Sequence, residues 1–146
     1  MDVLHSRQLI LNPMQDEKLT RFCKMLDLPK GGRVVDIGCG KGEFVHKLHE
    51  MYGVSGVGVD KSHYFIEECR RQKALKVPDA DIEYLLMDGK DYVTNEVFDL
   101  ASCIGASWIW GGIKGTLEAL SNLTKPGGFV VLGEPYWLKE PSELRD

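Results

Sequence analysis

The run VVDIGCGKG at positions 34–42 limits the fold and the ligand of this chain more than any other segment. Two β-branched residues lead into Asp36, and glycines then recur at every second position before a helical pattern begins. This order predicts a strand, a tight turn and a helix start that let a ligand approach the backbone closely. Phosphate-binding loops mostly keep the position of Asp36 apolar, whereas a carboxylate there favours a positive amino group. The run therefore predicts a site for a cationic ligand without phosphate.

Two other glycine-rich motifs fit this turn poorly. A nicotinamide-binding turn follows the pattern G-x-G-x-x-G, in which Gly38 and Gly40 match but the third position is Glu43. A P-loop would need glycine at position 35 and serine or threonine at position 42, where the chain has Val35 and Gly42.

Length and composition indicate one ordinary globular domain. The chain has 146 residues, of which 43% are hydrophobic and 27% charged, with a net charge of −4. No basic block suggests a nucleic-acid partner, and no apolar stretch is long enough to cross a membrane. The first residues lack the pattern of a signal peptide, so we expect a cytoplasmic protein.

The spacing of the cysteines predicts no metal site. The cysteines lie far apart, without metal-like spacing, inside predicted elements or the glycine turn, so we expect reduced thiols. They are Cys23, Cys39, Cys69 and Cys103.

Strand and helix patterns alternate along the chain. A helix is expected from Asn12, and further helices over 43–52, from about position 63 until before Pro78, and over 113–123. The expected strands are 33–37, 54–59, 82–87, 98–103 and 129–133. Alternation of this kind predicts an α/β fold, a doubly wound and mostly parallel sheet with helices on both faces. We expect a single domain over 1–146, with N-terminal helices in 1–29 and an α/β core over 30–137.

Four of the expected strands end in a carboxylate. Ligands of parallel α/β sheets bind at the carboxyl ends of the strands, so these side chains are expected on one rim. They are Asp36, Asp60, Asp88 and Glu134.

The turn and the segments after it resemble the class I S-adenosylmethionine-dependent methyltransferases. Their signature is a carboxylate followed, after one apolar residue, by G-x-G-x-G, which residues 36–42 match without a gap. The resemblance continues through 58–60, 86–89, 98–100 and 125–129 and covers the chain from Arg33 to Pro135. It implies a Rossmann-like methyltransferase core with strand order 3-2-1-4-5. It also implies methyl transfer from S-adenosylmethionine, here to a small-molecule acceptor.

The same resemblance assigns roles at the cofactor site. Asp36 would hold the amino group of S-adenosylmethionine, directly or through water, and Asp60 would accept hydrogen bonds from the ribose hydroxyls. Asp88 would contact the adenine amine, although Asp91 is a competing candidate and Asp88-Gly89 alone reads as a turn. Asp60 could equally cap the following helix. The full expected set is Asp36, Gly38, Cys39, Gly40, Asp60, Lys61, Asp88, Gly89, Cys103 and Ile104.

The acceptor side is expected beyond the fourth and fifth strands. Candidate acceptor residues are Glu134, Trp108 and Tyr136, which would offer aromatic walls and one carboxylate to a small acceptor. The tryptophans could instead be ordinary core. Residues 103–108 read CIGASW and lack the Asn/Asp-Pro-Pro-aromatic motif of enzymes that methylate amino groups of nucleic acids, so no nucleic-acid acceptor is expected.

From the resemblance we expect the final hairpin of the family to be missing from this chain. Class I methyltransferases usually have seven strands, whereas this chain ends at Asp146, twelve residues after Glu134. We expect either the N-terminal portion of a longer enzyme or a reduced member that covers the fifth strand otherwise. If residues 129–132 were uncovered, they would form an adhesive edge, and a homodimer through that edge is a hypothesis.

Two other functions remain open at this point. One is a non-catalytic module or subunit that binds S-adenosylmethionine. The other is an NAD-dependent oxidoreductase, against which Asp36 and Glu43 argue.

Overall fold

A single parallel sheet of six strands organises the protein. The computed structural model describes residues 6–11, 16–104 and 107–133, and the strand order is β1-β6-β5-β2-β3-β4. The strands are β1 (Ser6–Leu11), β2 (Arg33–Ile37), β3 (Ser55–Asp60), β4 (Ile82–Leu86), β5 (Phe98–Ile104) and β6 (Thr124–Gly133). The helices are α1 (Asp16–Leu26), α2 (Glu43–Tyr52), α3 (His63–Lys76) and α4 (Ile113–Asn122), with short 3₁₀ turns η2 (Gly89–Asp91) and η3 (Ser107–Trp110).

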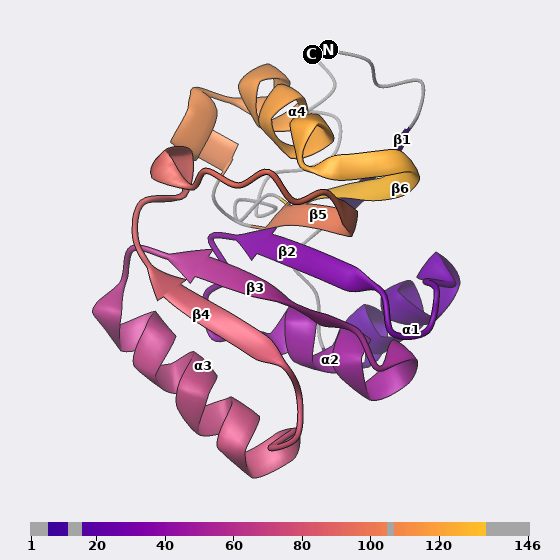
Figure 1. The fold of residues 1–146 in the computed structure, drawn as a ribbon, viewed down its shortest axis with the longest axis vertical. Coiled ribbons are helices and arrows are strands. Elements are labelled where there is room, and N and C mark those ends of the chain that lie inside the picture. Colours follow the sequence, from indigo (N-terminus) through magenta and orange to yellow (C-terminus); the bar gives the residue numbers. More distant parts are fainter. Residues whose placement is uncertain (1–5, 12–15, 105–106, 134–146) are drawn as a thin grey trace.

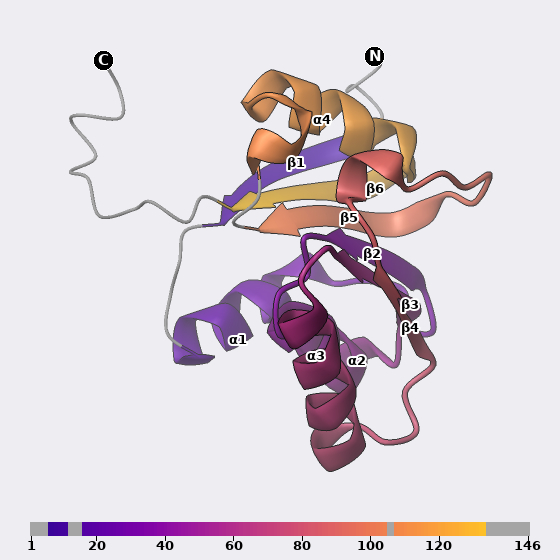
Figure 2. The same cartoon turned by 90° about the vertical axis from the view of Figure 1, so that its left-hand side faces the viewer.

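The predicted strand order 3-2-1-4-5 is confirmed. In chain order the five predicted strands are β2 to β6, and they lie as β4-β3-β2-β5-β6, with every pair parallel. Helices α1, α2 and α3 cover one face of the sheet and α4 covers the other (Figures 1 and 2). The chain therefore has the Rossmann-like, doubly wound α/β architecture expected from the alternating pattern.

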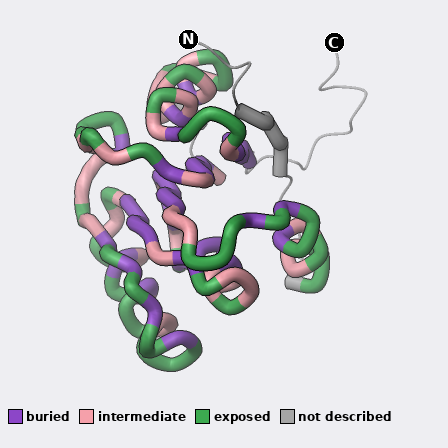
Figure 3. Tube along the Cα trace, turned by 45° about the vertical axis from the view of Figure 1, so that its right-hand side comes forward, coloured by how far each residue is buried: buried purple, intermediate pink, exposed green. Residues whose placement is uncertain are grey.

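Apolar residues on the two faces of each strand form two separate clusters. Val34 on β2 packs with Phe44 and Leu48 of α2 on one face, whereas Val35 packs with Leu120 of α4 on the other. This alternation follows from the two-residue period of a strand whose faces are both covered. Figure 3 shows the buried positions concentrated along the strands and on the helix sides that face them. Within the described ranges, no helix is both long and apolar enough to span a bilayer.

The expectation of N-terminal helices in 1–29 did not include the strand that residues 6–11 form. A helix does form, as α1, although residues 12–15, where its start was expected, lie outside the described residues. Residues 6–11 instead form β1, which pairs in parallel with β6 from Ser6 opposite Gly128 to Leu11 opposite Gly133. The physical reason is long-range: an edge strand leaves backbone N–H and C=O groups unpaired, and β1 satisfies those of β6.

Because of β1, the strand predicted as fifth is not an exposed edge. β6 has β5 on one side and β1 on the other. The hypothesis of a homodimer through an uncovered strand 129–132 therefore loses its premise. Among the described residues, β1 is the segment that covers this strand.

Close packing of β2 against β3 requires glycine at position 56. A Cβ atom there would lie 2.3 Å from the carbonyl oxygen of Val34 and 2.8 Å from Val34 Cγ2. We expect Gly56→Ala to lower the free energy of unfolding by about 3 kcal/mol, because a backbone atom cannot move aside without disturbing the strand pair. At Gly58 the atoms nearest to an added Cβ would belong to the side chains of Tyr84 and Cys39, at 3.0 and 3.1 Å.

Urea denaturation of the two variants tests this difference. Gly58→Ala serves as the matched control and is expected to lose less stability than Gly56→Ala, since side chains can adjust. An equal or smaller loss for Gly56→Ala would contradict the packing argument.

Candidate functional site

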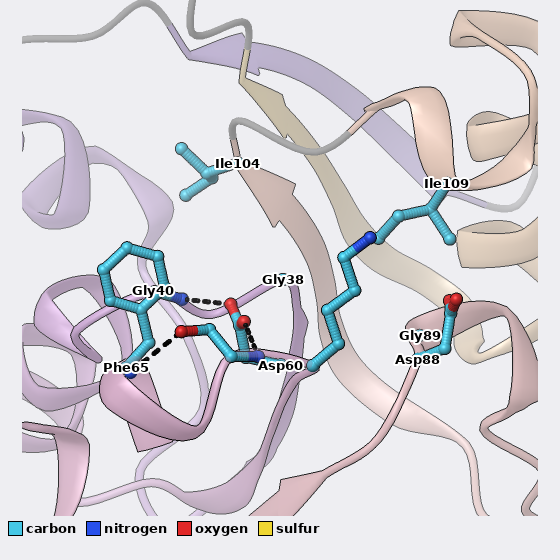
Figure 4. Close-up of a pocket in the computed structure, with 10 residues that line it drawn as sticks. Gly38, Gly40, Asp60, Phe65, Asp88, Gly89, Ile104 and Ile109 are labelled. Carbon is cyan, nitrogen blue, oxygen red and sulfur yellow. Dashed lines mark hydrogen bonds between the residues drawn. The ribbon is translucent and has the colours of Figure 1, made fainter. Parts of the chain in front are cut away.

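A cavity of about 300 Å³ opens at the carboxyl ends of the central strands (Figure 4). The ends of β2, β3, β4 and β5 meet there, on the rim where the strand-end carboxylates were expected. The cavity is lined by Gly38, Gly40, Asp60, Lys61, Ser62, Phe65, Asp88, Gly89, Ile104 and Ile109. Seven of these were predicted as cofactor-binding positions: Gly38, Gly40, Asp60, Lys61, Asp88, Gly89 and Ile104.

The glycine turn forms one wall of this cavity. Gly38 and Gly40 have φ angles of 75° and 55°, in the left-handed region that favours glycine. The backbone N–H groups of Gly38 and Cys39 both donate to the carbonyl of Val59, at 2.6 and 2.9 Å, which fixes the turn against β3. A Cβ atom added at Gly40 would meet nothing within 4 Å. The turn thus leaves open space beside its backbone.

Asp60 connects the glycine turn to the start of α3. Its Oδ2 accepts a hydrogen bond from Gly40 N at 3.0 Å, and its Oδ1 accepts one from Ser62 N at 2.8 Å. The N-cap of α3 is Ser62, whose Oγ accepts from Phe65 N at 3.2 Å, so the alternative of Asp60 as the helix cap is wrong. Each carboxylate oxygen can accept more than one hydrogen bond, so Asp60 can still accept from a ligand.

Asp88 and Gly89 form the wall at the end of β4. Asp88 Oδ1 accepts a hydrogen bond from Lys90 N at 3.1 Å. Gly89 is buried, and a Cβ atom there would lie 2.3 Å from Ile37 Cγ2 and 3.3 Å from Ile109 Cδ1. Asp91, the competing candidate, is not among the residues that line the cavity.

Asp36 is not among the residues that line the cavity. Its side chain is 2% exposed and Ser102 Oγ donates to its Oδ1 at 2.9 Å. Burial raises the pKa of Asp36 to about 7, an effect that the Ser102 hydrogen bond opposes and the charge of Asp60 reinforces. A carboxyl group of this kind can change its charge near neutral pH.

Cys39 and Cys103 were predicted at the cofactor, but their side chains are buried elsewhere. Cys39 Sγ lies 3.8 Å from Cys69 Sγ, and Cys69 Sγ donates to the carbonyl of Gly40 at 3.0 Å. Cys103 is fully buried in the cluster beneath α4. All four cysteines are buried, and none of them forms a disulfide.

Sequence reasoning missed three residues that line the cavity. Ser62 and Phe65 come from the cap and the first turn of α3, and a serine two residues after a strand-end aspartate could have indicated that cap. Ile109 belongs to the short turn η3, for which no periodic pattern exists. Figure 4 shows Phe65 and Ile109 on opposite sides of the cavity, with Ile104 between them at its upper edge.

The acceptor-side candidates are not placed by the structure. Glu134 and Tyr136 lie outside the described residues, and the side chain of Trp108 is likewise not described. Trp110 is half-buried against the cluster beneath α4, as the alternative interpretation of a core tryptophan expected.

Comparison with known proteins gives consistent results. Residues 34–128 match the family described as a methyltransferase domain. The YjhP protein of Escherichia coli K12 is 34% identical over 96% of this chain and 56% of its own length. A methyltransferase from Thiobacillus denitrificans, crystallised with S-adenosyl-L-homocysteine, superposes with a TM-score of 0.81 at 37% identity, covering 90% of this chain and 53% of that one. The trans-aconitate 2-methyltransferase of Rhizobium rhizogenes is 30% identical over 77% of this chain and 42% of its own length.

A glycine turn and acidic strand ends around one cavity define a nucleoside-binding α/β domain. Together with the family match over 34–128, they show that the chain belongs to the class I S-adenosylmethionine-dependent methyltransferases. The chain spans about half the length of YjhP and of the Thiobacillus protein. The family match favours S-adenosylmethionine over the nicotinamide cofactor considered above.

Proposed function

We propose that this chain binds S-adenosylmethionine in the cavity and transfers its methyl group to a small-molecule acceptor. The observation that carries the proposal is the cavity at the strand ends that Gly38, Gly40 and Asp60 line, in a chain of this family. A Cβ added at Gly40 would meet no protein atom within 4 Å, so the backbone of this cavity wall is open to a ligand.

The lining residues fit the parts of the cofactor. Gly38 and Gly40 would contact the methionine portion through their backbone, and Asp60 would accept from the ribose hydroxyls. Asp88 would accept from the adenine amine. The apolar residues Phe65, Ile104 and Ile109 supply the remaining walls, and Lys61 lies at the rim set by β3.

The reaction would require little of the protein beyond alignment. The sulfonium group of the cofactor supplies a methyl group with a good leaving group. The protein residues therefore act by orienting the acceptor in line with the methyl–sulfur bond and by excluding water. A neutral amine or a deprotonated oxygen or sulfur atom would suit as acceptor, because positive charge is lost from sulfur. We keep Glu134, Trp108 and Tyr136 as proposed acceptor-side residues.

A small-molecule acceptor is supported by the name of one relative, trans-aconitate 2-methyltransferase. A second candidate function is cofactor binding without methyl transfer.

Two measurements test the proposal. Calorimetry with S-adenosylhomocysteine is expected to show saturable binding, and NAD is expected to bind more weakly or not at all. Metabolite extracts incubated with the protein and S-adenosylmethionine labelled in its methyl group are then expected to yield a labelled product and S-adenosylhomocysteine. Binding without any labelled product would favour the second candidate. No binding by correctly folded protein would overturn both.

A further inference from the structure

Asp36 and Ser102 form a buried pair across β2 and β5. The two residues are register partners, and their side chains are 2% and 0% exposed. Ser102 Oγ lies 2.9 Å from Asp36 Oδ1 and 3.3 Å from the carbonyl oxygen of Val35. Since a serine hydroxyl carries one hydrogen, it can donate to only one of these two acceptors at a time.

This geometry gives the carboxyl group of Asp36 a hydrogen-bond partner in both of its charge states. When the carboxyl is ionised, Ser102 can donate to it, as a charge-assisted hydrogen bond. When the carboxyl is protonated, its own O–H can donate to Ser102 Oγ while the serine hydrogen turns to Val35 O. Neither state leaves a buried hydroxyl hydrogen unpaired, so the pair can change protonation without rearranging the sheet.

No cation among the described residues neutralises Asp36. The charge that acts on it is that of Asp60 on β3, which is negative. In the turn, the hydrogen bond with Cys69 and burial raise the pKa of Cys39, so its thiol is neutral at pH 7. The other titratable side chains in the cluster on this face of β2 are Cys23 on α1, Cys69 on α3 and Tyr84 on β4, with the partly buried Tyr52 packed against them. The buried His46 of α2 is hydrogen-bonded to Tyr84, and burial raises the pKa of Tyr84, so its phenol is neutral at pH 7. Burial raises the pKa of Cys23 to about 12 and lowers that of His46 to about 4, so these two are also neutral.

We propose that Ser102 is a positioning residue that holds Asp36 ready to ionise when the ammonium group of the cofactor arrives, so that cofactor binding releases a proton. The inference rests on the proposed function. The carboxyl proton passes to solvent, and the ammonium group becomes the positive partner that the described residues do not supply.

The affinity for S-adenosylhomocysteine is then expected to depend on pH. Burial raises the pKa of Asp36 to about 7 in the free protein, so below that pH the carboxyl must lose a proton before it attracts the ammonium group. Affinity should rise by about tenfold between pH 6 and pH 8, with a midpoint near 7. Calorimetry at pH 6.5 in buffers of different ionisation enthalpy should report proton release on binding.

Ser102→Ala tests the role of the hydroxyl. Loss of its hydrogen bond to the carboxylate is expected to raise the midpoint by about one pH unit. Affinity at pH 7 should fall by about fivefold and return to within about twofold of the parent protein at pH 9. A merely structural role would weaken binding equally at every pH. Ser102→Cys, which has nearly the same size and a weaker donor, should shift the midpoint in the same direction and serves if the alanine variant does not fold.

Thr124→Val is the matched control. Thr124 is also buried, and its Oγ1 donates to Leu120 O at 2.6 Å, but it lies at the opposite end of the sheet from the cavity. Its loss should leave the midpoint unchanged. Binding by the parent protein could depend on pH while Ser102→Ala and Ser102→Cys leave the midpoint of that dependence unchanged. This result would overturn the role of Ser102 alone. A parent protein that binds without pH dependence would overturn the assignment of Asp36, and one that does not bind at all would overturn the proposed function.

Discussion

The Asp36→Asn variant is expected to be more stable than the parent protein at pH 8 in the absence of cofactor. Burial raises the pKa of Asp36 from 3.8 to about 7 in the folded protein. Between these pH values the folded state keeps a proton that the unfolded state releases, so the contribution of Asp36 to stability falls as pH rises through this window. Above pH 7 the accumulated cost is about 4 kcal/mol, which a neutral amide of the same shape avoids.

Urea denaturation of both proteins at pH 4 and pH 8 measures this effect. At pH 4 the parent carboxyl is largely protonated when folded, and the two free energies of unfolding should be similar. At pH 8 the variant should be the more stable protein. Equal stabilities at pH 8 would contradict the burial of an ionised Asp36 without a cationic partner.

The same substitution is expected to weaken binding of S-adenosylhomocysteine by at least about tenfold at pH 8, because the amide carries no charge to attract an ammonium group. Stability and binding thus change in opposite directions. Asp99→Asn is the control: Asp99 accepts a hydrogen bond from Arg33 N at 2.8 Å and pairs with Lys125 at the amino ends of the strands. Its neutralisation should lower stability and leave binding unchanged. Unchanged binding in Asp36→Asn would remove Asp36 from the cofactor site.

Local pattern and spacing predicted the parts of this protein that depend on short segments. The strand at 33–37 and the turn at Gly38 and Gly40 follow from β-branched residues and left-handed glycine positions. The position of Asp60 at the cavity follows from its place at the end of a parallel strand. These features need no knowledge of distant residues, and the cavity therefore lies where the sequence placed it.

Features that depend on long-range pairing could not be predicted. β1 forms because β6 offers a free edge more than a hundred residues away in the chain, and no local pattern encodes that contact. The side chains of Asp36, Cys39 and Cys103 are buried and are not among the residues that line the cavity. A carboxylate at a strand end predicts the rim of a site, but its burial depends on residues of neighbouring strands, as Ser102 on β5 shows for Asp36.

Gly40→Val is expected to abolish measurable binding of S-adenosylhomocysteine while the protein remains folded. The φ angle of Gly40 is 55°, so valine would strain the turn by about 1–2 kcal/mol. In the free protein a Cβ at this position would meet nothing within 4 Å, so we expect the variant to fold. The added side chain would instead occupy the space proposed for the methionine portion. Affinity for S-adenosylhomocysteine should fall by at least about a hundredfold, because the valine side chain would overlap with the proposed position of the ligand.

Gly31→Val separates the strain from the loss of ligand space. Gly31 has a φ angle of 73° and also has nothing within 4 Å of an added Cβ, but it lies before β2 at the amino end of the strand. Its N–H donates to Tyr52 O at 3.0 Å. Both variants should lose similar stability in urea denaturation, yet only Gly40→Val should lose binding. Equal binding by the two variants would show that the space beside Gly40 is not where the cofactor lies.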